Sequence, residues 1–66
     1  MEIIVNGKTE RVSEKVSIRE FLHLKSIPID RVVVELNQDI IKRVDWQRAL
    51  LQDRDRLEII KIVGGG

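Results

Sequence analysis

One helix start, placed between stretches that alternate like strands, most limits the folds open to this chain. Ser17 and Glu20 form a capping box, in which each side chain accepts a hydrogen bond from the other residue's amide. Val16 and Phe21 take the two positions of a hydrophobic staple around it. We therefore predict that a helix begins at Ile18 and that this helix covers a structure made mostly of strands.

The predicted helix is short and has one apolar face. Pro28 has no amide hydrogen and disfavours helical angles in the residue before it, so the helix is expected to end near Ser26, after about two turns. Spacings of three and four place Ile18, Phe21 and Leu22 on one side of it. We expect this side to close the hydrophobic core.

The N-terminal residues predict a hairpin. Residues 2–5 and 8–12 have the β-branched, apolar character of strands. Asn6 and Gly7 separate them, and both residues accept the positive φ angles of a type I′ turn. The chain is therefore expected to open with two antiparallel strands.

Further strands are predicted in the second half of the chain. Residues 31–36 and 56–63 alternate in apolar character over the length of a strand. A tight turn leads into a short strand around residues 40–41. Residues 43–52 have irregular apolar spacing around Trp46 and favour no single structure, although they have room for a helical turn.

The resulting order of elements, ββαββ, predicts an α+β fold. A long apolar last strand suits the centre of a mixed sheet, parallel to the first strand, with the helix on one face. This is the β-grasp, or ubiquitin-like, arrangement, with four to five strands and one main helix. We expect one domain over residues 1–63 and a flexible glycine tail over residues 64–66.

Composition argues against several kinds of site and partner. The chain has no cysteine and one histidine, which excludes a disulfide framework and an ordinary zinc site. Its 12 basic and 11 acidic residues are scattered, which argues against nucleic-acid binding. No apolar run approaches the roughly 20 residues of a membrane span, and no secretory signal is apparent. We expect a cytoplasmic protein with no membrane or nucleic-acid partner.

Few side chains offer catalytic chemistry. His23 stands alone on a short helix, and no serine has a partner base in the sequence. Asp53 and Asp55 flank Arg54 in a segment typical of a turn, which is the ordinary use of aspartate. Trp46 is expected to anchor packing rather than to bind a ligand. We therefore expect no catalytic residue and no metal site.

The chain ends on three glycines directly after the last predicted strand. Glycine has no Cβ, so Gly64 and Gly65 can pass through a channel too narrow for other residues. Three extended residues reach about 10 Å, enough to carry the Gly66 carboxylate into another protein's active site. On composition alone, a frayed end or a linker remains the alternative.

Several stretches of the sequence, spread over the whole chain, are similar to those of one known family. These stretches are MEIIVNG at 1–7, LNQDII at 36–41, Asp45-Trp46, LQDRD at 51–55 and IVGGG at 62–66. In them the chain resembles the ThiS family, the sulfur carrier proteins of thiamine biosynthesis, which are similar in fold to ubiquitin. Arg54 departs from the glycine that is common in the family between the two aspartates.

The resemblance implies a chemistry for the C-terminus. A ubiquitin-activating-like adenylyltransferase would use ATP and magnesium to convert the Gly66 carboxylate to an acyl adenylate, from which the sulfur of a persulfide donor displaces AMP. The product is a Gly66 thiocarboxylate that donates sulfur to thiazole synthase. In this role the chain is a cosubstrate with no bound cofactor, because the charge-stabilising groups and the metal belong to its partner.

Other functions remain open. The small subunit of molybdopterin synthase uses the same glycine ending, although it is usually longer. A plain β-grasp interaction or RNA-binding module would leave the glycines inert, but scattered basic charge and two aromatic residues argue against base stacking. Phosphopantetheine, biotinyl and lipoyl carriers need attachment motifs that the sequence lacks, since Ser17 follows Val16 and Lys61 lies within a predicted strand.

One face of the sheet is predicted to bind the partner. If Leu57 and Ile59 face the helix, strict alternation leaves a set of apolar residues on the opposite face. A contiguous apolar patch rimmed by Glu35 and Glu58 is typical of an interaction site. The predicted docking residues are Ile4, Val33, Ile60, Ile62 and Val63.

Overall fold

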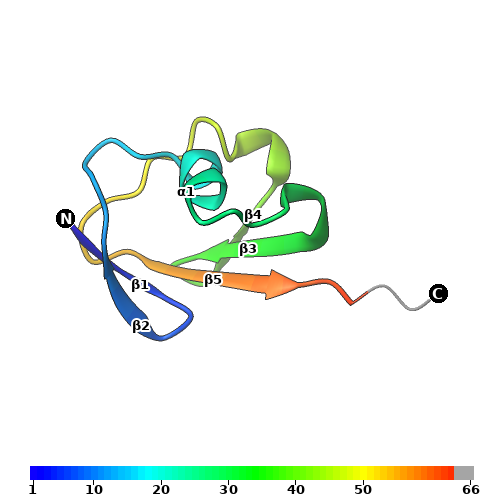
Figure 1. Ribbon diagram of the computed structural model, residues 1–66, viewed down its shortest axis with the longest axis horizontal. Helices are drawn as coiled ribbons and strands as arrows, with labels where there is room; N and C mark the ends of the chain where they lie inside the picture. The colour runs from blue at the N-terminus through cyan, green and yellow to red at the C-terminus, as the bar shows by residue number, and fades with distance from the viewer. Residues whose placement is uncertain (64–66) are drawn as a thin grey trace.

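The computed structural model describes residues 1–63, and its centre is a five-stranded mixed sheet covered on one face by a helix (Figure 1). The strand order is β2-β1-β5-β3-β4, with β5 parallel to β1 and antiparallel to β3. The predicted β-grasp order, with the last strand at the centre, is confirmed. The elements are β1 (Glu2–Val5), β2 (Lys8–Arg11), α1 (Ile18–Leu24), the 3-10 helix η1 (Ile29–Arg31), β3 (Val32–Leu36), β4 (Asp39–Ile41), the 3-10 helix η2 (Arg43–Asp45) and β5 (Arg56–Lys61).

Two hairpins with the same turn geometry form the edges of the sheet. Asn6 and Gly7 have φ angles of 48° and 84° and join β1 to β2, as predicted for a type I′ turn. Asn37 and Gln38, with φ angles of 51° and 76°, join β3 to β4 in the same way. The Asn6 side chain also accepts a hydrogen bond from the Ile59 amide at 2.8 Å, which ties the first hairpin to the central strand.

Helix α1 begins where the capping box places it. The Ser17 hydroxyl accepts from the Glu20 amide at 3.0 Å, and the Glu20 carboxylate accepts from the Ser17 amide at 3.3 Å. The helix ends at Leu24, before the predicted Ser26, because Ser26 has a φ angle of 57° and turns the chain out of the helix. In residues 1–63 no helix is long and apolar enough to cross a membrane.

The hydrophobic core lies between α1 and one face of the sheet. The predicted alternation is confirmed, because Ile3, Val34 and Leu57 point to this side and are fully buried. The helix contributes its predicted apolar face, of which Phe21 is 1% exposed. The buried apolar residues are Ile3, Val5, Val16, Ile18, Phe21, Leu22, Val32, Val34, Trp46, Leu51 and Leu57.

Residues 43–52, whose structure the sequence left open, begin with η2 and then cross the start of α1. Trp46 is 2% exposed, and its indole Nε1 donates to the Ile41 carbonyl at 2.8 Å. The Leu51 amide donates to the Val16 carbonyl at 2.8 Å, which holds the end of the segment beside the capping box. The prediction that Trp46 anchors packing is confirmed.

Candidate functional site

The central strand β5 leads the chain out of the sheet, on the side of the molecule away from the N-terminus (Figure 1). The strand ends at Lys61, earlier than the predicted Val63, although the Ile62 amide still donates to the Arg31 carbonyl at 2.8 Å. Val63 is 91% exposed. The chain therefore leaves the folded body at Val63, directly before the three glycines.

Hydrogen bonds on both sides anchor the strand from which the tail leaves. On the β1 side, the Asn6 amide donates to the Leu57 carbonyl at 2.9 Å. On the β3 side, the Asn37 amide donates to the Arg56 carbonyl at 2.8 Å, and the ladder continues as far as the pair Val32 and Lys61. β5 is therefore paired on both sides at its start, and its pairing with β3 alone continues to the end from which the tail leaves.

The three glycines themselves lie outside the described residues. The roles assigned to Gly66 as the carrier and to Gly64 and Gly65 as the threading segment therefore stay predictions. The division into a domain over 1–63 and a flexible tail over 64–66 likewise stays a prediction. What the structure adds is the place from which the tail starts and the surface around that place.

The predicted docking residues on the outer face of the sheet form two groups. Val33 and Ile60 are direct partners in the β3–β5 ladder, and Ile62 follows Ile60 by two residues. Ile60 and Ile62 are 47% and 50% exposed, and Val63 continues toward the tail. Val33, Ile60, Ile62 and Val63 are called the tail-side patch below. Their role in binding stays a prediction.

Ile4 lies apart from the tail-side patch. Its partners across the sheet are Thr9 on β2 and Arg56 on β5. Arg56 precedes Ile60 by four residues, so roughly 13 Å of strand separates Ile4 from the patch at about 3.3 Å per residue. Ile4 is therefore surrounded by polar residues and is not continuous with the other four predicted docking residues.

Ile40 also lies on this outer face, although it was not predicted as a docking residue. It is 67% exposed and stands opposite Glu35 in the β3–β4 ladder. Its neighbour Ile41 pairs with the buried Val34, so alternation alone places Ile40 on the outer side. That alternation, in a strand as short as β4, was the signal available in the sequence.

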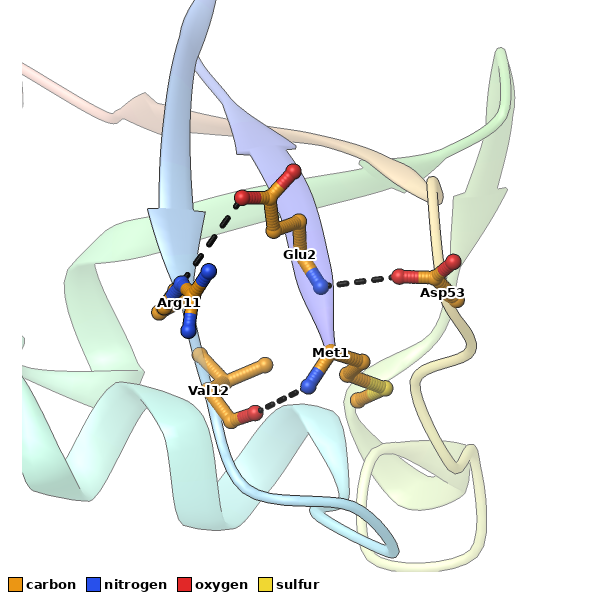
Figure 2. Close-up of polar contacts among 5 residues, drawn as sticks. All are labelled: Met1, Glu2, Arg11, Val12 and Asp53. Carbon is orange, nitrogen blue, oxygen red and sulfur yellow. Dashed lines mark hydrogen bonds and ion pairs between the residues drawn. The ribbon is translucent and has the colours of Figure 1, made fainter.

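The aspartates of the 53–55 turn hold the fold together at the start of β5. Asp53 accepts from the Glu2 amide at 2.8 Å (Figure 2). Asp55 accepts from the Gln52 amide at 2.7 Å and from the Asn37 side chain at 3.0 Å. These bonds confirm that both residues serve the turn, and residues 1–63 contain no cluster of acidic or histidine side chains that would hold a metal ion.

Arg54 occupies a backbone position that suits glycine. Its φ angle is 71°, in the left-handed region that glycine enters without steric cost. Its amide donates to the Glu2 carbonyl, which fixes that conformation. The departure noted in the sequence is accommodated by strain in the backbone rather than by a different turn.

The only histidine lies away from the tail. His23 is exposed on α1 and lines an open hollow of about 550 Å³ together with Arg19 and Glu20. A mixed set of exposed charged side chains is typical of a solvated helix surface. Within residues 1–63, the hollow that His23 lines includes none of the predicted docking residues.

Comparison with known proteins places this arrangement in one family. The model of the ThiS family matches residues 1–66. The crystal structure of the thiamine biosynthesis protein ThiS from Geobacter metallireducens is 33% identical, with a TM-score of 0.85, and the match covers 100% of both chains. The predicted fold and the resemblance noted in the sequence are both confirmed.

Two further relatives extend the comparison. An uncharacterized protein ycf40 of Pyropia yezoensis is 35% identical over 66 residues, which are 100% of this chain and 93% of that protein. A thiazole synthase of Paramagnetospirillum magneticum is 27% identical over 100% of this chain, but the match covers only 20% of the synthase. On the whole-length family match and the shared fold, the chain belongs to the ThiS family of ubiquitin-like sulfur carriers.

Proposed function

We propose that this chain carries sulfur on the carboxylate of Gly66 for thiazole formation in thiamine biosynthesis. One observation supports this most directly: the central strand β5 is held by β3 as far as its end at Lys61, and the exposed Val63 follows two residues later, immediately before the glycines. A reactive terminus presented from a rigid strand reaches a partner's active site without unfolding the domain. Family membership supplies the chemistry that such a terminus would carry.

The proposed reaction replaces one carboxylate oxygen by sulfur. The carboxylate attacks the α-phosphorus of ATP, pyrophosphate leaves, and an acyl adenylate forms. The terminal sulfur of a persulfide donor then attacks the acyl carbon, and AMP leaves with the original oxygen. A second thiol attacks the donor sulfur of the resulting acyl disulfide, so that a new disulfide forms and the thiocarboxylate is released.

In this scheme the chain is a cosubstrate rather than an enzyme. Charge develops on the phosphates and on the acyl carbon, so the groups that stabilise it, including magnesium, belong to the adenylyltransferase. The chain's own contribution is the carboxylate, a slim tail and the surface on which the partner docks. ATP, magnesium, the adenylyltransferase and the persulfide donor are part of the proposal.

Thiazole synthase is the proposed acceptor of the sulfur. The thiazole synthase of Paramagnetospirillum magneticum includes a segment similar to this whole chain, so in that protein a carrier-like segment and a synthase share one polypeptide. The whole-length match to a thiamine biosynthesis protein also favours thiazole formation over the molybdopterin alternative. A carrier and a synthase that act together are expected to bind each other.

Mass spectrometry of the intact chain tests the proposal. The full chain is incubated with the adenylyltransferase, ATP, magnesium, a persulfide donor and a thiol, and the expected product has one oxygen replaced by sulfur. Omitting ATP is expected to abolish the change. A chain that stays unmodified under complete conditions, or a chain lacking Gly66 that gains sulfur as fast as the full-length chain, would overturn the proposal.

A further inference from the structure

Two open hollows flank the end of β5 and share the Lys61 side chain. One hollow, of about 400 Å³, lies beside η1 and is lined by Arg31, Lys61 and the apolar Ile62 and Val63, among others. The other, of about 340 Å³, lies between the first hairpin and α1, and Lys8 and Lys61 are among its lining residues. Both hollows beside the end of β5 are therefore lined by basic as well as apolar residues.

Basic side chains outnumber acidic ones in the lining of these two hollows. The second hollow also contains Lys25 and Glu10, but these two neutralise each other in an ion pair of 2.7 Å between Lys25 Nζ and Glu10 Oε1. Lys8, Arg31 and Lys61 remain, all exposed and without an ion pair within residues 1–63.

The surrounding acids do not cancel this charge. Among residues 1–63, Glu10 is the only carboxylate that lines either hollow, and Asp30, which precedes Arg31 in η1, lines neither. The formal charge of the whole chain is only +1, so three cations at one end represent a local excess over the rest of the surface.

The length of the tail determines which part of the partner protein lies opposite these cations. Three residues span about 10 Å when extended, so an extended tail would carry the reacting carboxylate up to that distance beyond Val63. Arg31 and Lys61, which line one hollow together with Val63, would therefore face the rim of the partner's channel rather than the nucleotide within it. Lys8 lies further back along the sheet, because it pairs with Val5, which in turn pairs with Leu57. A rim that attracts three cations is expected to carry carboxylates, with apolar surface for Ile62 and Val63 between them.

We propose that Lys8, Arg31 and Lys61 form a basic collar that docks on acidic side chains around the tail channel of the adenylyltransferase. This inference rests on the proposed function and identifies the kind of surface that the partner presents. Opposite charges around the channel steer the tail toward its entrance and fix the orientation of docking. The collar thus acts on association, before any chemistry at Gly66.

The charged groups of the collar do not take part in the backbone hydrogen bonds of the sheet. The Lys61 backbone pairs with Val32 in the ladder, and the Arg31 carbonyl accepts from the Ile62 amide. Neither bond involves the charged groups. Replacing the charges is therefore expected to leave the sheet intact.

The test compares two double variants of equal net charge in the full chain. Arg31→Gln with Lys61→Gln removes two collar charges, and Lys15→Gln with Arg19→Gln removes two exposed charges that line neither hollow. Stopped-flow association with the purified adenylyltransferase is measured at low and high ionic strength. The collar variant is expected to associate about tenfold more slowly at low salt, and the difference should vanish near 1 M, where the Debye length is about 3 Å.

Further measurements separate this inference from the proposed function. Arg31→Lys with Lys61→Arg keeps the charges and is expected to retain fast association. Sulfur transfer at saturating concentration is expected to be equal in all variants. Suppose that the wild-type chain binds and gains sulfur. The proposed role of the collar is then overturned if the collar variant associates as fast as the wild type, or no more slowly than the matched control. A wild-type chain that gains no sulfur would instead overturn the proposed function.

Discussion

Glu35 on β3 and Glu58 on β5 stand directly opposite each other across an antiparallel ladder. Directly opposed like charges destabilise a sheet by a few tenths of a kcal/mol, up to about 1 kcal/mol. The pair lies beside Val33 and Ile60 in the same ladder, on the outer face that carries the tail-side patch. The free domain therefore has a local electrostatic cost next to its predicted docking surface.

Glu58→Lys is expected to stabilise the free domain by about 0.5 kcal/mol, because an attractive cross-strand pair replaces a repulsive one. Urea unfolding followed by circular dichroism measures the shift in midpoint. Glu14→Lys makes the same charge change in a loop and is expected to shift it much less. A Glu58→Lys chain no more stable than the Glu14→Lys chain would show that the repulsion is already screened by solvent.

Ile60→Asp is expected to weaken binding to the adenylyltransferase about tenfold or more, since it places a charge in the middle of the tail-side patch. Isothermal titration calorimetry gives the affinity, and thermal unfolding checks the fold. Ile40→Asp is the matched control, because Ile40 is exposed on the same face but lies on the edge strand β4, opposite Glu35 and not opposite Val33 or Ile60. Equal affinities for both variants and the wild type would remove Ile60 from the interface.

Arg54→Gly is expected to raise stability by about 0.5 to 1 kcal/mol, because Arg54 has a φ angle of 71° that costs a side-chain-bearing residue energy. The ion pair lost with it is 3.9 Å long and highly exposed, so it contributes little. Urea unfolding measures the gain. Arg11→Gly, in the extended strand β2, is expected to be destabilising, and a loss of stability in both variants would contradict the strain argument.

Local signals made most of the fold predictable. The capping box and the Asn6-Gly7 turn depend on residues three positions apart or fewer, and both have the predicted geometry. Alternation assigned the buried and exposed faces correctly because the pleat has a period of two. The α1 cap and the strand faces therefore follow from short-range chemistry that a single sequence carries.

Long-range contacts account for what the sequence did not predict. Residues 43–52 are held by bonds to the start of α1, in which the Trp46 carbonyl accepts from the Arg19 amide and the Leu51 amide donates to the Val16 carbonyl, and irregular spacing does not encode these bonds. Alternation assigns a face but not a register, so it could not show that Ile4 faces Arg56 rather than the tail-side patch. The candidate site was therefore predicted in its residue types and only in part in its layout.

Changes at the three tail glycines are expected to slow sulfur incorporation to different degrees, because each change has a different physical effect. Gly65→Val adds a branched side chain and restricts φ, so it is expected to obstruct passage through the channel although the carboxylate keeps its distance. Gly64→Ala, nearest the folded body, is expected to be tolerated best. Deleting Gly66 draws the carboxylate back by about 3.5 Å, a full residue of reach.

Rates of sulfur incorporation, followed by intact-protein mass spectrometry, rank these variants. The expected order is wild type, then Gly64→Ala, then Gly65→Val, with the deletion inactive. None of the changes touches the buried core, so the midpoint of thermal unfolding is expected to stay within experimental error of the wild type. Because stability is held constant, a lower rate reports on passage and reach alone. A Gly65→Val chain that reacts as fast as Gly64→Ala would show that the channel is wide at that position.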